Sequence, residues 1–113
     1  MITLYHNPRC RKSRETLELI QEKGETLKIK LYLKEPPTVK ELKEVLAKLG
    51  LRPLELIRKQ EAVFKEKFKG KEFADDQWID VMIAHPILIE RPIAIKGNTA
   101  LIGRPPSNVL ELL

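Results

Sequence analysis

The sequence predicts an α/β fold with a mixed β-sheet, and the order of its elements supports this prediction. A β-prone segment at residues 2–5 and an alternating segment at residues 27–33 flank one helical stretch. Two such strands pair in parallel through a right-handed crossover. Near the C-terminus, the pair Gly97-Asn98 separates two short apolar segments and indicates a β-hairpin. Because hairpin strands are antiparallel, the sheet as a whole is mixed.

Length and composition favour a single domain over residues 1–113, outside a membrane. Apolar residues make up 42% and charged residues 33%, and no apolar run reaches the roughly 18 residues that a membrane span needs. The net charge of +5 suits an anionic partner. The first residues carry no secretory signal pattern, and a lone cysteine forms no internal disulfide, so we expect a cytoplasmic protein.

The first half of the chain reads as strand, helix and strand. The helical stretch covers residues 11–23, with Leu17, Leu19 and Ile20 as apolar positions, and Gly24 follows where a left-handed C-terminal cap is favoured. In residues 27–33, every second residue is Leu or Ile. This alternation predicts a strand with one buried face.

Helices are predicted for most of the middle of the chain. Thr38 and Glu41 form a capping box ahead of a helix that Gly50 closes. Pro53 opens a short helical turn, and a weaker, highly charged helix covers residues 61–68. A further helix is capped by Asp75 or Asp76 and stopped by Pro86. After the hairpin, a short helix at residues 106–113 ends the chain.

The only cysteine, Cys10, immediately precedes the first predicted helix. Free backbone N–H groups and the positive end of the helix dipole meet at that position and stabilise a thiolate, the nucleophilic form of cysteine. The neighbouring cations are also expected to lower the thiol pKa; they are Arg9, Arg11, Lys12 and Arg14. The alternative is a buried structural cysteine.

Ser13 occupies the place of the second thiol in a CxxC motif, so a redox cycle at Cys10 must end with an external thiol such as glutathione. A phosphatase-type Cys-x5-Arg loop is excluded because residue 16 is Thr16. His6, Cys10 and His85 are the only His and Cys residues, too few for a structural zinc site, so no metal is expected. His6 is either a strand-end histidine or a residue that polarises Cys10.

The hairpin places two arginines opposite each other. With Gly97-Asn98 as the loop, the register that pairs residue 95 with 100 and 93 with 102 also pairs Arg91 with Arg104. Two facing cations repel, and an anion bound between them removes the repulsion. Guanidinium groups suit tetrahedral oxyanions. The alternative to an anion site is that Arg91 and Arg104 are both solvated. Arg58, which follows the short helical turn at Pro53, either joins such a site or lies on a solvated basic face.

Several segments of the chain together resemble the ArsC family of glutathione/glutaredoxin-coupled arsenate reductases. They are His6-Asn7-Pro8-Arg9-Cys10-Arg11-Lys12-Ser13-Arg14, Leu56-Ile57-Arg58-Lys59, His85-Pro86-Ile87-Leu88-Ile89, Glu90-Arg91-Pro92-Ile93 and Ile102-Gly103-Arg104-Pro105. The resemblance implies a thioredoxin-like fold with a mixed sheet and a helical insertion at about residues 38–85. It also implies a cis peptide at Arg91-Pro92.

The resemblance further implies roles for individual residues. Cys10 corresponds to the nucleophile, and the oxyanion-binding arginines correspond to Arg58, Arg91 and Arg104. The supporting residues are His6, Ser13, Arg14 and Pro92. In the implied cycle, arsenate bonds to the thiolate, glutathione joins the arsenic as co-substrate, and glutaredoxin clears the mixed disulfide to release arsenite. No bound cofactor is implied.

The sequence departs from the best-matched reductases at Arg11-Lys12, where they carry small residues, and with its last residue at Leu113 we expect it to be without their C-terminal tail. Both features resemble the shorter YfgD-like branch. An alternative function is a thioredoxin-fold regulatory module similar to Spx-type proteins, which contact RNA polymerase; the net charge and the missing second thiol favour it. Nucleic-acid binding is not expected, because aromatic residues make up only 5% of the chain.

Overall fold

The computed structural model describes residues 1–113 and contains two compact units. Unit 1 consists of Met1–Glu35 and Arg91–Leu113, and unit 2 is the intervening segment Pro36–Glu90. The helical insertion implied at about residues 38–85 falls inside unit 2. That the chain behaves as a single domain stays a prediction.

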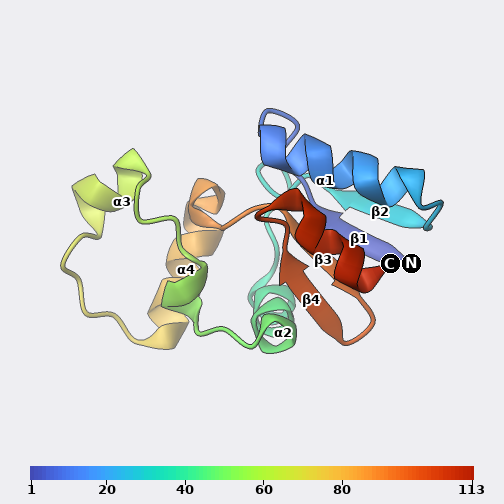
Figure 1. Ribbon diagram of the computed structural model, residues 1–113. Coiled ribbons are helices and arrows are strands. Elements are labelled where there is room, and N and C mark those ends of the chain that lie inside the picture. The colour runs from blue at the N-terminus through green and yellow to red at the C-terminus, as the bar shows by residue number, and fades with distance from the viewer. The chain divides into compact units, whose positions relative to one another are not determined.

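Unit 1 contains a four-stranded mixed sheet in the order β2-β1-β3-β4 (Figure 1). Its strands are β1 (Ile2–Tyr5), β2 (Leu27–Lys30), β3 (Ile93–Lys96) and β4 (Thr99–Ile102). The β1–β2 pair is parallel, and the other two pairs are antiparallel. The predicted α/β class, the mixed sheet and the hairpin register are therefore confirmed.

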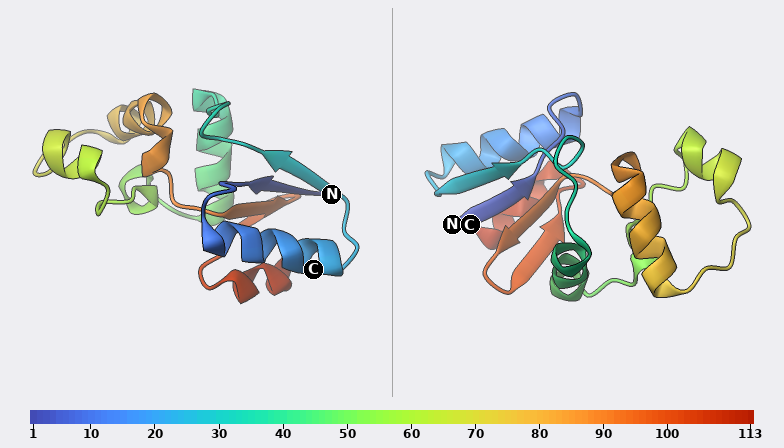
Figure 2. Two further views of the ribbon diagram at one scale, coloured as in Figure 1. Left: turned by 90° about the horizontal axis from the view of Figure 1, so that it is seen from above. Right: turned by 180° about the vertical axis from the view of Figure 1, so that it is seen from behind.

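Two helices cover one face of this sheet. Helix α1 (Arg11–Glu22) and the 3₁₀ helix η3 (Pro106–Leu112) lie side by side there, as Figures 1 and 2 show from three directions. Between these helices and the sheet is the core of unit 1, which includes Ile2, Leu4, Ile20, Ala94 and Val109, all fully buried. Burying apolar area is the main source of stability here.

The strand predicted at residues 27–33 is confirmed over residues 27–30, but its extension to residue 33 and its buried face are wrong. Strand β2 ends at Lys30, because the chain turns at Leu31, whose carbonyl oxygen accepts the N–H groups of Lys34 and Glu35 at 3.0 and 2.9 Å. As an edge strand, β2 leaves Ile29 exposed, and Leu33 is also exposed. The alternation therefore continues through a turn and does not mark a buried face.

In the turn after β2 the buried side chain is that of Tyr32, whose ring stacks on that of Tyr5 with 6.2 Å between ring centroids.

None of the helices in the protein combines the length and the apolar character that crossing a lipid bilayer requires.

Unit 2 is helical. Its elements are α2 (Val39–Leu49), η1 (Pro53–Leu56), α3 (Ala62–Lys67), α4 (Asp75–Ala84) and η2 (Pro86–Leu88). The predicted capping box is confirmed: Thr38 Oγ1 accepts the Glu41 N–H, and Glu41 Oε1 accepts the Thr38 N–H. The α4 cap differs from the prediction, because Ala74 is the cap residue and its N–H donates to Gln77, while Asp75 lies in the first turn.

Candidate active site

Cys10 lies at the junction between strand β1 and helix α1. It is the N-cap residue of α1, with an extended backbone (φ −95°, ψ 122°), and its carbonyl oxygen accepts the Arg14 N–H at 3.0 Å. Its own N–H donates to the carbonyl oxygen of Asn7 at 3.0 Å, which closes the turn at Pro8 and Arg9. The residue is 9% exposed. The sulfur therefore lies at the free N–H groups of the first helical turn.

The pKa of the Cys10 thiol lies below its ordinary value. Burial raises this pKa, but hydrogen bonds from the backbone N–H of Ser13, from the Arg91 side chain and from the backbone N–H of Lys12 lower it, together with the charge of Arg91. The lowering groups outweigh the burial, so the thiolate is favoured.

The sequence suggested a different cause for this pKa, namely the four neighbouring cationic side chains. The structure directs two of them elsewhere: Arg11 pairs with Glu15 at 2.9 Å, and Arg14 donates to the carbonyl oxygen of Pro8 at 3.0 Å. All four residues are exposed, one in the loop before α1 and three in the first turn of α1. Backbone N–H groups and a distant arginine therefore replace the neighbouring side chains as the cause.

The end of the hairpin brings Arg91 and Arg104 to Cys10. Beyond the last ladder pair, the Gly103 N–H donates to the Pro92 carbonyl oxygen at 2.9 Å, so the predicted register continues by one step. Arg104 Nε donates to the Arg91 carbonyl oxygen at 2.8 Å, and Arg104 Nη2 lies 3.8 Å from Cys10 Sγ. Two guanidinium groups thus interact with one sulfur.

Both arginines precede a cis proline. The Arg91–Pro92 peptide is cis, as the resemblance implies, and the Arg104–Pro105 peptide is cis as well, which the sequence did not indicate. Next to them, Gly103 packs without a side chain against α1: a Cβ atom there would lie 2.7 Å from Thr16 Oγ1 and 2.9 Å from Pro92 Cγ. The absence of that atom lets the hairpin end approach the helix that carries Cys10.

His6 and Ser13 form a buried hydrogen-bonded pair beneath the turn. His6 Nδ1 lies 2.6 Å from Ser13 Oγ, which also accepts the Asn7 N–H at 3.0 Å. Burial and, to a lesser extent, the charge of Arg14 lower the pKa of His6. In a neutral imidazole, Nδ1 accepts the Ser13 hydroxyl proton in one tautomer and donates to Ser13 Oγ in the other, so the pair is hydrogen-bonded in either case. His6 therefore supports the turn through Ser13. At the position of the second cysteine of a CxxC motif, the chain thus carries a hydroxyl that holds the turn.

Arg58 belongs to unit 2 and is not part of a solvated basic face. The residue is 8% exposed; its Nε donates to Glu61 at 3.2 Å and its Nη1 donates to Glu90 at 3.1 Å. Its N–H also donates to the Leu88 carbonyl oxygen at 2.8 Å. The structure thus brings His6, Cys10, Ser13, Arg91 and Arg104 together within unit 1, while the role of Arg58 stays a prediction.

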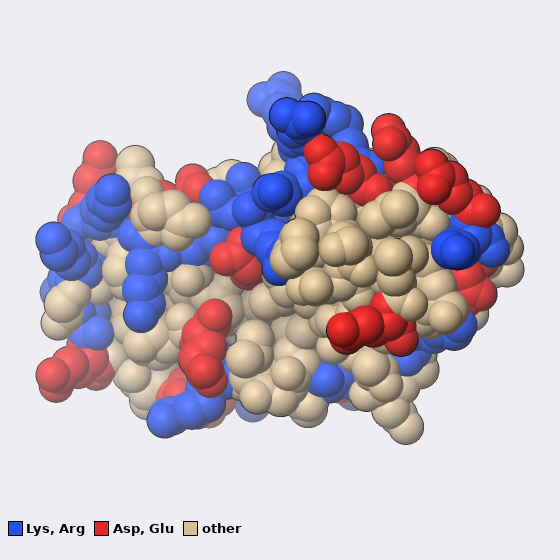
Figure 3. Space-filling model, in the orientation of Figure 1, with Lys and Arg blue, Asp and Glu red and all other residues tan.

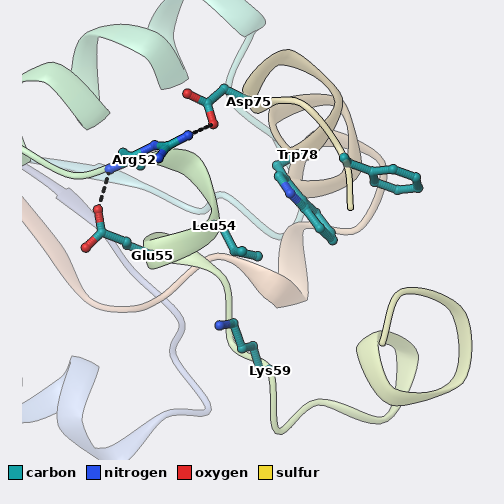
Figure 4. A pocket seen from close by; sticks show the side chains of 7 residues that line it. Arg52, Leu54, Glu55, Lys59, Asp75 and Trp78 are labelled. Atoms are coloured by element: carbon teal, nitrogen blue, oxygen red, sulfur yellow. Dashed lines mark hydrogen bonds and ion pairs between the residues drawn. The ribbon is translucent and has the colours of Figure 1, made fainter. Parts of the chain in front are cut away.

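The sequence did not indicate the cavities. One of about 400 Å³ lies in unit 1 between residues 6–9 and the chain after β2, from Leu31 to Lys34. Another cavity of about 400 Å³ lies in unit 2 beside Trp78 (Figure 4). In its lining, the Arg52 backbone N–H donates to Glu55 and Arg52 Nη2 donates to Asp75. No group of three or more His, Cys, Asp or Glu side chains could hold a metal ion.

Comparison with known proteins gives matches over nearly the whole of this chain. The model of the ArsC family matches residues 5–112. The chain is 40% identical to the uncharacterized protein YfgD of Escherichia coli K12, over 99% of this chain and 96% of that protein. It is 42% identical to an arsenate reductase of Escherichia coli, over 99% of this chain and 80% of that one. A solved structure of an arsenate reductase from Vibrio cholerae matches with a TM-score of 0.94 at 42% identity, covering 99% of this chain and 97% of that one.

Proposed function

The chain belongs to the ArsC family and has its thioredoxin-like fold, and from this premise we propose that it reduces arsenate, with the Cys10 thiolate as nucleophile and with glutathione and glutaredoxin as the source of electrons. The small oxyanion is the substrate, glutathione is a co-substrate, and no resident cofactor takes part. We place the reaction in the cytoplasm, because a reducing compartment keeps Cys10 as a thiol.

One observation carries this proposal: two arginines interact with a cysteine that lies at a helix start and has a lowered pKa. Arg104 Nη2 is 3.8 Å from the sulfur, and the Arg91 side chain hydrogen-bonds to it. A thiolate in this position attacks electrophiles. The same guanidinium groups offer donors for the oxygens of an incoming tetrahedral anion.

The proposed cycle transfers two electrons to arsenic. The Cys10 sulfur bonds to As(V), and one arsenate oxygen leaves as water. The sulfur of glutathione replaces a second oxygen, which also leaves as water. The glutaredoxin thiolate then attacks that glutathione sulfur, and the electron pair of the broken sulfur–arsenic bond stays on arsenic as As(III). Water finally displaces the Cys10 sulfur and arsenite departs, so that two thiols have become one disulfide.

Supporting roles follow from the contacts around the turn. His6 and Ser13 hold the loop that presents Cys10. Arg14 holds the same loop through the Pro8 carbonyl oxygen. Pro92 sets the hairpin end against Gly103. Arg58 is proposed as a third oxyanion-binding arginine on the strength of the resemblance alone.

The test is coupled NADPH consumption with arsenate, glutathione, glutaredoxin and glutathione reductase. We expect turnover by the wild-type protein and none by Cys10→Ser, which keeps the shape of the side chain but lacks the sulfur nucleophile. Equal rates for the two proteins would contradict the proposal.

A second outcome of the same experiment separates the alternative function. If the wild-type protein shows no turnover, and immobilised Cys10→Ser captures RNA polymerase from a cell extract in a specific manner, a regulatory module of the Spx type replaces the reductase. Capture must exceed that by a matched column carrying an unrelated protein of similar net charge.

A further inference from the structure

The unit 1 cavity lies next to the turn that carries Cys10. One wall is formed by residues 6–9, which immediately precede Cys10, and the other by Leu31, Leu33 and Lys34. Its volume of about 400 Å³ falls in the range of small-molecule sites. The cavity is therefore a pocket on the wall of the same turn that presents the thiol.

The lining of this pocket combines apolar residues with two cations and with the polar residues His6 and Asn7. Pro8, Leu31 and Leu33 supply apolar surface, and Arg9 and Lys34 are exposed cations of its lining. Neither cation forms an ion pair within the chain. Figure 3 shows lysine and arginine side chains gathered over the β1–α1 loop and the start of α1, at the top of the view. The pocket therefore suits a small anionic ligand that also carries methylene groups.

We propose that this pocket binds glutathione, the peptide thiol that the proposed function requires, with its methylene groups against Pro8, Leu31 and Leu33 and its carboxylates at Arg9 and Lys34. The proposal rests on the proposed function for its choice of ligand. Glutathione carries a carboxylate at each end and one ammonium group, so its net charge complements the two cations.

The size of the pocket favours the tripeptide over a docked protein. A stable protein interface covers about 800 Å² on each partner, whereas three extended residues span only about 10 Å. Cavities of about 400 Å³ are the size of small-molecule sites. The pocket is therefore assigned to glutathione itself, and contact with the glutaredoxin protein becomes an outcome of the test.

Cys10 follows one wall of this pocket directly in the chain, although it is not itself a lining residue. Asn7 and Arg9 line the pocket, and the Cys10 N–H donates to the Asn7 carbonyl oxygen at 3.0 Å, so Cys10 closes the turn that they form. Adjacent Cα atoms are about 3.8 Å apart. Because the thiol of glutathione is on its central residue, a molecule bound here presents its thiol beside the turn that ends at Cys10.

Binding is tested first without chemistry. The probe is S-methylglutathione, which has no free thiol, titrated by calorimetry into Cys10→Ser protein that carries in addition Lys34→Glu, Leu33→Gln or neither. Both added changes are at exposed positions, and circular dichroism checks the fold. A matched control is Lys28→Glu, the same charge reversal on exposed β2 outside the pocket. We expect Kd to rise at least tenfold for the two pocket variants and less than twofold for the control.

Turnover is tested second, in proteins that keep Cys10. We expect Lys34→Glu to raise KM for glutathione at least tenfold while KM for arsenate stays within twofold of wild type. Arsenate reduction with an unchanged KM for glutathione would overturn the pocket assignment and leave the proposed function standing. A Lys34→Glu change that raises only the KM for glutaredoxin would also overturn the pocket assignment, because that result would mean that the glutaredoxin protein binds this surface.

If the wild-type protein does not reduce arsenate, the proposed function fails, but the calorimetric test still decides the pocket. Binding of S-methylglutathione that Lys34→Glu and Leu33→Gln weaken, and Lys28→Glu does not, supports the assignment. Absence of binding, or equal binding by all variants, overturns it. Amide chemical-shift changes confined to residues 6–9 and 31–34 are the expected signature of the bound probe.

Discussion

Arg104 donates a 2.8 Å hydrogen bond from Nε to the backbone carbonyl oxygen of Arg91. Nη2 of the same guanidinium group lies 3.8 Å from the Cys10 sulfur. Arg91 therefore has two roles: its backbone carbonyl oxygen holds Arg104, and its side chain contacts the thiol.

Arg104→Lys keeps the charge but should lose activity. A lysine ammonium cannot donate to the Arg91 carbonyl oxygen and present a second, rigidly placed donor at the thiol at once. Hydrogen bonds to charged groups contribute about 1.5–3 kcal/mol, which corresponds to a fall in kcat/KM for arsenate of about 10- to 100-fold. The matched control is Arg52→Lys, the same change at an exposed arginine of unit 2. Equal kcat/KM values for the two variants would refute the role of Arg104.

Arg91→Ala should raise the pKa of the Cys10 thiol. The change removes a hydrogen bond and a positive charge that both favour the thiolate, while the burial that opposes it remains. The pH midpoint of iodoacetamide alkylation should therefore move upward, and the rate at pH 7 should fall. Arg11→Ala is the control, because Arg11 pairs with Glu15 on the exposed side of α1. A larger shift for Arg11→Ala would restore the neighbouring cations as the cause.

The hairpin and the thiol position could be predicted from the sequence because both depend on local rules. Gly97 has a positive φ of 60°, as a tight turn requires, and the two-residue loop fixes the cross-strand pairs outward. That register alone brings residues 91 and 104 together. In the same way, the turn and the following helical pattern were enough to place Cys10 at a helix start.

Other features depend on tertiary context that a pattern does not contain. The alternation at residues 27–33 could not reveal that β2 lies at the sheet edge or that the chain turns at Leu31. The burial of Arg58 depends on Glu90, 32 residues away in the chain. The pKa of Cys10 likewise depends on Arg91, which only the assembled sheet brings to the thiol.

Gly103→Ala should destabilise unit 1. The added Cβ would lie 2.7 Å from Thr16 Oγ1 and 2.9 Å from Pro92 Cγ, and the proline ring cannot rotate away. Overpacking of this kind costs about 1–3 kcal/mol, and thermal unfolding should show a lower Tm. Because Arg104 is the next residue, kcat/KM for arsenate should fall as well.

The double variant Gly103→Ala/Thr16→Ala is the control for this clash. It removes the Thr16 atoms nearest to the new Cβ, so it should recover part of the Tm loss relative to the sum of the single changes. Strict additivity of the two single effects would show that the loss does not arise from contact with Thr16.

His6 should make the protein less stable in mild acid. Its pKa is lowered in the folded protein by burial and then by Arg14, so the unfolded chain takes up a proton near pH 6.5 while the folded chain does not. Stability contributed by neutral His6 is therefore complete above that pH and is lost as the pH falls below it. Urea unfolding at pH 7.5 and 5.5 should show a larger loss for wild type than for His6→Gln. Equal losses would mean that His6 is protonated in the folded protein.

Arg58→Ala should destabilise unit 2. Arg58 is nearly buried and donates to the carboxylates of Glu61 and Glu90, which its removal would leave close together without their shared cation. Because both carboxylates are partly exposed, water offsets part of the loss, and we expect about 2 kcal/mol. The measurement is urea unfolding followed through the fluorescence of Trp78, which is in the same unit. Arg52→Ala, at an exposed ion pair of unit 2, should cost less than about 1 kcal/mol. If the two variants lose equal stability, the pairing of Arg58 does not stabilise unit 2.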